Sequence, residues 1–431
     1  MKKLFALSLL SAASLLADNG ADPAFDNEAS LLADNVKKPL QQQPPRPAYT
    51  PPNSCCKPCC VPRPKKCIDC ECYTPSFYEP NGCDYGLFFT ADFLYWYGRE
   101  TNLSYAAKEI AASLNPGTPL TTVVLSYNNM KHLDTKWAPG FRVGVGRETE
   151  CGGWDYYLNY TWYHNRSKNR TFVPNFGTAA LPFTPLLGQE TLLSPWINPS
   201  IFGGGRPYRF NLVSALWQLT LQDIDFELGW KFWLSQSFTM RPFAAFRAAW
   251  VRRDFMTTSI RNNTLSDGLI ATFKDRFKDR YWGVGMELGL QPEWYFTPNF
   301  AIISNFDASL IWGKFRDKKK SDYFSQFLAP AVDYHRGFKN SFSKMQTIID
   351  LMVGFRWDAT WACDRFRSAL DIGWEHHVWF NFSNMVKTNT QFIASPGVGG
   401  VGSTENMTLS YEESQGDLIF GGLTIRFRFD F

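Results

Sequence analysis

The chain has 431 residues, of which 45% are hydrophobic and 16% aromatic, and its formal net charge is +4. So many aromatic residues exclude a disordered protein, and the near-balanced charge gives no argument for a nucleic-acid partner. Beyond residue 17 no apolar run is long enough for a membrane-spanning helix.

The first residues have the pattern of a secretory signal peptide. Lys2 and Lys3 precede a short apolar run that ends at Ala17, and polar residues follow from Asp18. A membrane anchor is the alternative, but the run falls short of the roughly 18 residues that an anchor needs. We expect residues 1–17 to be a signal peptide cleaved after Ala17.

Residues 18–84 are dense in proline and contain eight of the ten cysteines. Such a stretch favours extended polyproline conformations and builds no core, so we expect a disordered segment. The cysteine spacing is compatible with zinc, but a secreted chain favours disulfides and no histidine lies nearby, so we predict no metal site. The disulfide candidates are Cys55, Cys56, Cys59, Cys60, Cys67, Cys70, Cys72 and Cys83, with Cys151 and Cys363 farther along the chain.

Adjacent cysteines such as Cys55 and Cys56 rarely pair with each other, because the bond geometry is strained. They are better placed to bridge to other segments or other chains. Our hypothesis is that the segment cross-links the protein to itself or to other cysteine-rich envelope proteins. Stapling within one chain is the alternative, and the disulfide connectivity stays open.

From Tyr85 onward, apolar and polar residues alternate with the period of β-strands. The clearest run extends from Asp223 to Phe232, where every second residue is apolar. The pattern predicts ten strands, at residues 86–97, 135–148, 153–164, 213–233, 238–253, 280–296, 300–315, 345–361, 365–382 and 416–431.

The connections between these strands alternate in length without exception. The short ones are 149–152, 234–237, 297–299 and 362–364, and the long ones are 98–134, 165–212, 254–279, 316–344 and 383–415. Outer-membrane barrels have short periplasmic turns and long external loops. Ten strands then place both chain ends in the periplasm. A further hairpin near Thr121–Tyr127 would make twelve strands, the alternative count.

The strand faces fit a barrel with lipid outside and water inside. In the last strand Leu423, Ile425, Phe427, Phe429 and Phe431 share an apolar face, and a terminal phenylalanine resembles the sorting signal of bacterial outer-membrane proteins. An edge strand of a soluble sheet is the alternative. Residues expected in aromatic belts at the membrane interfaces are Tyr95, Trp96, Trp154, Trp162, Trp233, Tyr295, Trp361 and Trp379. We therefore predict an all-β protein whose residues 85–431 form a transmembrane antiparallel β-barrel.

Charged residues of both signs alternate with the outward residues and are predicted to line a pore. They are Arg142, Asp155, Asp225, Glu227, Lys231, Arg241, Arg247, Glu287, Asp307, Asp350, Arg356, Glu375, Arg426 and Arg428. Rings of one sign would set an ion preference, but this set is mixed and leaves the selectivity open. A salt-bridged, wet interior without a selective role is the alternative. Ten strands would leave a narrow or partly occluded lumen.

Histidines give no sign of an enzyme. The five are His132, His164, His335, His376 and His377, and no spacing assigns a catalytic partner to any of them. We predict that the protein is not an enzyme and has no cofactor.

Several segments together resemble the Legionella-type and chlamydia-like major outer membrane proteins, a pore-forming family. They are Phe89–Trp96, Trp137–Gly144, Trp154-Asp155 with Tyr160–Trp162, Arg241–Phe243, Gly373–His376 and Gly416–Phe431. The resemblance covers residues 85–431 and implies a porin of the bacterial outer membrane. The cysteine-rich segment lies outside it and is more similar to the disulfide-linked envelope proteins of chlamydia-like bacteria.

We therefore expect a porin for passive diffusion of small hydrophilic solutes, with its N-terminal segment in the periplasm and disulfide-linked into the cell envelope. The alternatives are a structural envelope scaffold or an adhesin with little open-channel activity. The expected partners are outer-membrane lipid, small hydrophilic solutes and other cysteine-rich envelope proteins, with no nucleic acid. Whether the barrel is a homo-oligomer stays open.

Overall fold

A computed structural model describes residues 86–114, 123–149, 153–174, 190–197, 208–235, 237–262, 270–326, 332–361, 366–394 and 405–431. The predicted signal peptide, the proline-rich segment and all ten cysteines lie outside these residues. Within the described ranges, no helix has the length and apolar character needed to cross a membrane.

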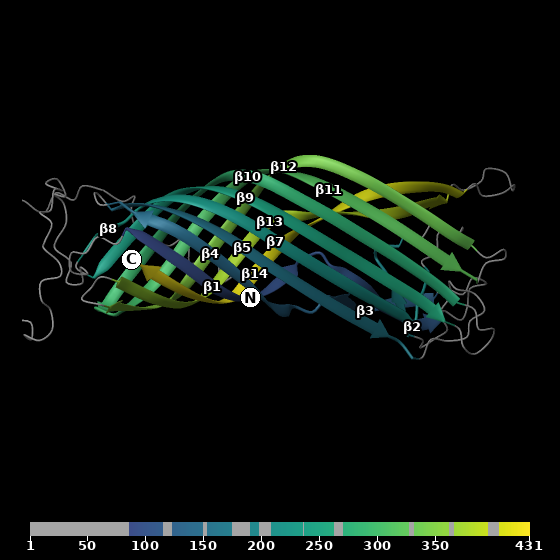
Figure 1. Cartoon of the computed structure of the whole chain (residues 1–431). Helices are drawn as coiled ribbons and strands as arrows, with labels where there is room; N and C mark the ends of the chain where they lie inside the picture. The colour runs from purple at the N-terminus through teal and green to yellow at the C-terminus, as the bar shows by residue number, and fades with distance from the viewer. Residues whose placement is uncertain are drawn as a thin grey trace, which may run out of the picture. The chain divides into compact units, whose positions relative to one another are not determined.

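Ten strands of the described chain form one closed antiparallel sheet (Figure 1). Each barrel strand pairs with the next one along the chain, and the last pairs with the first, so Phe89 lies opposite Phe429. The barrel strands are β1 (Leu87–Glu100), β4 (Lys136–Glu148), β5 (Trp154–Phe172), β7 (Leu212–Trp230), β9 (Phe238–Asn262), β10 (Ile270–Thr297), β11 (Phe300–Ser325), β12 (Val332–Trp361), β13 (Phe366–Ala394) and β14 (Glu405–Asp430). The predicted count of ten is confirmed.

The additional hairpin exists but does not join the barrel sheet. β2 (Ser104–Leu114) pairs with β3 (Val123–His132) and with β6 (Glu190–Leu193) in a separate three-stranded sheet. The short β8 (Phe232–Trp233) pairs only with the start of β9. The alternative count of twelve barrel strands is therefore wrong. In Figure 1 β2 and β3 lie at one end of the barrel, and β8 and the C-terminus lie at the other.

Most barrel strands are longer than predicted, and the extra residues lie at the ends that face the long connections. β10 begins at Ile270 rather than 280, and β12 begins at Val332 rather than 345. The strand ends at the short turns agree with the prediction to within a few residues, and β8 takes the end of the predicted fourth strand. The prediction stopped short at these ends because the polarity of the two strand faces reverses there. The outward residues become polar and the inward residues become apolar, so the alternation continues but no longer matches the pattern of a lipid-facing strand.

β10 shows this reversal most clearly. Its outward side chains Trp282, Met286 and Leu288 are apolar and exposed, while Glu287 points inward and is buried. Beyond Trp282 the outward residues are Arg280, Lys278, Arg276 and Lys274, whereas the inward Phe273, Phe277 and Tyr281 are buried. We call the part with the apolar outer face the membrane section and the part with the apolar interior the aromatic section.

The outward aromatic side chains mark the two ends of the membrane section. Trp154 stacks on Trp230 near the short turns, with ring centroids 6.0 Å apart. On β10, Trp294 and Trp282 are both outward and exposed. The strand between them is roughly 40 Å long at about 3.3 Å per residue, and a tilt of about 40° reduces this to roughly 30 Å along the axis, the thickness of a bilayer core.

Three aromatic residues expected in these belts lie inside the barrel instead. Trp96, Tyr295 and Trp379 are at most 6% exposed. Each stands one residue from an outward neighbour, so the period of two directs it into the lumen. Their position along the strand indicated the membrane interface, but they lie on the inward face of the strand and are therefore buried in the lumen.

The aromatic section has a packed core like that of a soluble domain. Trp196, which follows β6, lies between Phe255 and Phe277, with ring centroids 5.3 and 5.1 Å away. Its indole Nε1 donates to the carbonyl oxygen of Ser104, at 2.7 Å. Lys319 on β11 donates to the carbonyl oxygen of Trp196, at 3.2 Å. The segment around β2 and β6 is thereby held inside the end of the barrel.

Candidate functional site

The interior of the membrane section contains a cavity of about 140 Å³ that is lined by side chains from all ten barrel strands. All fourteen of the predicted pore-lining residues border it: Arg142, Asp155, Asp225, Glu227, Lys231, Arg241, Arg247, Glu287, Asp307, Asp350, Arg356, Glu375, Arg426 and Arg428. The alternation of β-strands brings these residues together although they are spread over nearly 290 residues of chain.

The predicted pore-lining set omits several charged residues on the same walls, although the strand pattern already placed Asp223 and Asp371 on inward faces. Asp223, Glu293 and His377 line the cavity, and each lies at an even spacing from a predicted neighbour on the same strand face. Glu148 and Asp371 also contribute. The period of two could have found all of these residues, had every position on an inward face been counted.

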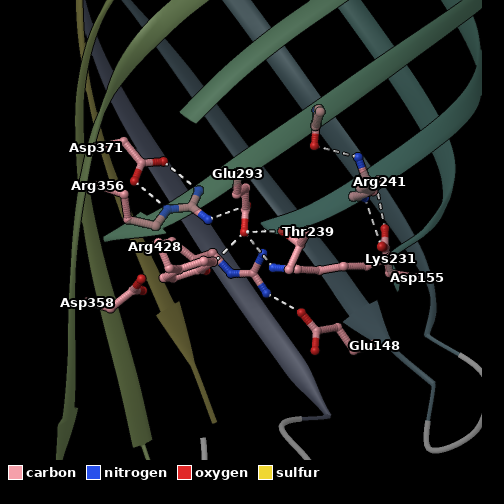
Figure 2. Close-up of polar contacts among 12 residues, drawn as sticks. Glu148, Asp155, Lys231, Thr239, Arg241, Glu293, Arg356, Asp358, Asp371 and Arg428 are labelled. Carbon is pink, nitrogen blue, oxygen red and sulfur yellow. Dashed lines mark hydrogen bonds and ion pairs between the residues drawn. The ribbon is translucent and has the colours of Figure 1, made fainter. Parts of the chain in front are cut away.

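Near the short turns, Glu293 is the centre of one network (Figure 2). It accepts from Arg356 at 2.5 Å, from Lys231 at 2.7 Å and from Thr239 at 3.2 Å. Arg356 also binds Asp371 through two hydrogen bonds, at 2.7 and 2.8 Å. Charge-assisted pairs of this kind fix side chains in one geometry, so this end of the lumen is rigidly organised.

Arg241 anchors a second group on the neighbouring strands (Figure 2). Its guanidinium donates twice to Asp155, at 2.8 and 2.5 Å, and to Glu227 and Gln291, both at 2.9 Å. Arg428 pairs with Glu148, the last residue of β4. Glu148 has 41% of its side chain exposed, so this ion pair is in contact with solvent.

Deeper in the membrane section, Arg247 is surrounded by carboxylates. Its guanidinium lies 2.8 Å from Asp225, 2.9 Å from Glu287 and 2.7 Å from Asp350. Asp223 lies 3.3 Å away. A single arginine therefore faces at least four acidic groups at this level of the lumen.

His377 extends this cluster to the opposite wall. Its ring nitrogens lie 2.8 Å from Asp350 and 3.2 Å from Glu375. Glu375 also accepts from Arg142, at 3.0 and 3.2 Å. The described residues include no group of three or more His, Cys, Asp or Glu side chains arranged to hold a metal ion.

The cavity lining as a whole is acidic. It contains eleven Asp and Glu side chains against seven Arg and Lys side chains. Charges on low-dielectric walls focus their field into the enclosed space, and rings of carboxylates favour cations in pores.

The aromatic section closes the cavity toward the long connections. Trp96, Trp379 and Phe420 line its inner end and are at most 2% exposed. Above them Arg253 on β9 pairs with Glu100 on β1, although three barrel strands separate β1 from β9. This ion pair therefore crosses the lumen.

The remaining histidines lie apart from this cavity or at its rim. His164 hydrogen bonds to Thr220 at 2.9 Å, and His335 to Asp322 at 2.6 Å. His132 is exposed and His376 is partly buried. The side chains that contact His164 and His335 are thus a threonine and carboxylates.

The chain is distantly similar to several solved structures. The outer-membrane protease OmpT of Escherichia coli is 10% identical, with 83% of this chain and 99% of OmpT covered and a TM-score of 0.34. A Pseudomonas aeruginosa FadL homologue is 9% identical, with 81% and 90% covered and a TM-score of 0.24. The Ralstonia pickettii toluene transporter TbuX is 9% identical, with 80% and 90% covered and a TM-score of 0.24. Scores this low carry no functional argument, and no curated protein matches the chain.

The family comparison is decisive by contrast. The model of the Legionella pneumophila major outer membrane protein precursor matches residues 83–431, which include every described strand. Together with the closed ten-stranded barrel and its apolar outer band, this match places the protein in the bacterial outer membrane. The chain belongs to the Legionella major outer membrane protein family.

Proposed function

We propose that the barrel is a narrow pore for small hydrophilic solutes and that it prefers cations. The observation that supports this most strongly is the acidic lining of the cavity, with eleven carboxylates against seven basic side chains. The basic residues described above each pair with at least one carboxylate, so carboxyl oxygens outnumber the basic groups on the walls. A cation entering from the short-turn end would replace some of its hydration with these oxygens.

Conduction also requires a passage through the aromatic section. The segment around β2, β6 and Trp196 fills that end of the barrel, so we expect low conductance while it is in place. Trp196 holds the segment through its contacts with Phe255 and Phe277 and its bond to Ser104. Movement of this segment would join the polar cavity to the outside.

Planar-bilayer recording of the refolded full chain tests the proposal. In a KCl gradient we expect a reversal potential of the sign that cation preference gives. The double variant D223N/E287Q removes two carboxylates beside Arg247 and should lower that preference. The control D254N removes a carboxylate from the outer face of β9 and should leave the reversal potential unchanged. Anion preference in the unmodified chain would refute the proposed selectivity.

A structural anchor is the second candidate, and the closed aromatic section favours it. Trp196→Ala separates the two functions, because it loosens the segment inside the barrel. A pore should then conduct more than the unmodified chain. If neither the unmodified chain nor Trp196→Ala conducts ions, the barrel would act as an anchor.

A disulfide link to the envelope from a periplasmic N-terminal segment stays a prediction, since the cysteines lie outside the described residues. Reduced and non-reduced samples run on a gel would test it. Bands of higher molecular mass that disappear on reduction would support cross-linking between chains. Identical monomer bands in both samples would refute it.

A further inference from the structure

The outer surface of the aromatic section is strongly basic on four neighbouring strands. Ten Lys and Arg side chains lie on the outward face beyond the exposed Trp250, Trp282 and Trp312, and all are exposed or half-exposed. We call this surface the basic face; it consists of Arg252 on β9, Lys274, Arg276, Lys278 and Arg280 on β10, Lys314, Arg316, Lys318 and Lys320 on β11, and Lys339 on β12.

The strand register arranges six of these side chains in two rows of like charge. Arg280 lies directly opposite Arg252 on one side and Arg316 on the other. Two residues farther out, Lys318 lies opposite both Lys278 and Lys339. Neighbouring strands are about 4.8 Å apart, and like charges directly opposite each other destabilise a sheet.

Asp254 lies directly opposite Lys278 at the end of the lysine row, but its carboxylate pairs with Arg276 instead. Arg276 pairs with Asp254 at 3.2 Å, and Lys320 with Asp322 at 3.1 Å. Among the described residues, no carboxylate lies within ion-pair distance of the arginine row or of the lysine row. The arginines of the cavity differ in this respect, since Arg241 and Arg247 each contact two or more carboxylates. An anion from outside the chain would therefore relieve the repulsion in the rows.

The depth of the rows indicates which anion that is. Arg252 and Arg280 stand two residues beyond the opposed pair Trp250 and Trp282, on the same face. Outward tryptophans mark the boundary between hydrocarbon and headgroups, so the next outward position lies among the headgroups. On β13, by contrast, the outward residues after Trp374 are His376, Val378 and Phe380, so the basic face belongs to one side of the barrel.

We propose that the basic face binds the phosphate groups of an anionic lipid in the leaflet at the long-connection end of the barrel. The planar guanidinium fork matches phosphate oxygens in pairs, and lysines add positive charge farther out. Three arginines at one depth on adjacent strands would grip one or two phosphates at the membrane surface. The binding is independent of whether the lumen conducts.

Lipid binding to the full chain in neutral detergent tests this directly. The probes are lipid A as a phosphorylated glycolipid, the same lipid after removal of its phosphates, and inorganic phosphate at equal phosphate concentration. Native mass spectrometry counts the bound lipid, and thermal unfolding reports stabilisation, because a ligand that binds the folded state raises the midpoint. We expect binding and stabilisation with lipid A alone. Equal binding of the dephosphorylated lipid, or equal protection by inorganic phosphate, would overturn the proposal.

Two variants locate the site. R252Q/R280Q/R316Q and K278Q/K318Q/K339Q each remove one row and should weaken lipid A binding at least about tenfold, as the loss of one or more charge-assisted contacts would. The matched control R166Q/K168Q/R170Q removes three outward charges from β5, which face the neutral Gln218, Leu216 and Ser214 of β7. An equal loss in the control would refute the rows as the site. If a row variant fails to fold, the comparison of lipid A with dephosphorylated lipid A and inorganic phosphate on the unmodified chain still tests whether the protein binds lipid phosphates.

Discussion

The two sections of this barrel are built from the same ten strands and have opposite polarity. In the membrane section the exposed face is apolar and the interior holds buried Arg247 with its carboxylates. In the aromatic section the exposed face carries Lys and Arg, and the interior holds Trp196, Phe255 and Phe277. The backbone alternation is continuous, so only the solvent around the strand differs. Lipid requires an apolar exterior, and water allows the usual apolar core.

The largest expected effect comes from the charged interior. Arg247→Met leaves Asp225, Glu287 and Asp350 without their shared cation. Breaking a buried pair by removing one partner destabilises a protein by about 3–5 kcal/mol, so we expect a loss of that size. Urea unfolding of the refolded barrel measures it. A loss below about 1 kcal/mol, the usual value for a surface pair, would show that the cluster is solvated like a surface.

A similar loss is expected from the aromatic interior, for a different reason. Phe255→Ala removes a fully buried ring that contacts Trp196. Phenylalanine-to-alanine changes in packed cores destabilise by about 3–5 kcal/mol. The same unfolding experiment applies. If this section were an open, water-filled lumen, the substitution would have little effect on stability. That result would contradict the conclusion that the aromatic section has a packed apolar interior.

The outer surfaces should respond with opposite tolerance to one substitution. Met286→Arg places a charge on the lipid face of the membrane section, where Met286 is 63% exposed. The expected destabilisation is about 2–4 kcal/mol at the bilayer midplane. Gln218→Arg is the matched change on the outer face of the aromatic section, where it lies opposite Asp254 on one side and Arg166 on the other, so that attraction and repulsion offset each other. It should change stability by less than about 0.5 kcal/mol, and unfolding in lipid vesicles would measure both.

The smallest effect concerns the strand ends beyond the basic rows. The hydrogen bond to Asp322, together with nearby Asp333, raises the pKa of His335 above its ordinary value of 6.5. Stabilisation from this contact is present below pH 6.5 and is lost as the pH rises through the raised pKa. Titration of the His335 ring signals by nuclear magnetic resonance measures the shift. Asp322→Asn should return the pKa toward 6.5, and an unchanged pKa in that variant would exclude the contact as its cause.

The sequence was most informative where one polarity pattern held along a whole strand. Phe427 and Phe431 were predicted to face lipid, and each is exposed on the outer surface. The four short turns and the count of ten strands also followed from the pattern. The strand ends at the long connections did not, because the reversal near Trp282 and Trp312 made the extensions resemble loops.

The acidic surplus of the cavity was hidden for a related reason. The sequence alone presented a mixed set of charges, and the predicted pore lining left out Asp223, Glu293 and His377. Only the register of the closed sheet shows that several carboxylates meet around Arg247. Likewise, the basic rows exist only because β9 to β12 align Arg252, Arg280 and Arg316 at one depth.

What the amino-acid sequence determined by itself is therefore the barrel and its lipid-facing side, because an alternation of period two is a local property of each strand. The closure of the lumen, the placement of β2 and β6 inside it, and the partners of each charge were decided by the tertiary structure. These features depend on pairings between residues far apart in the chain, and no local pattern encodes such a pairing.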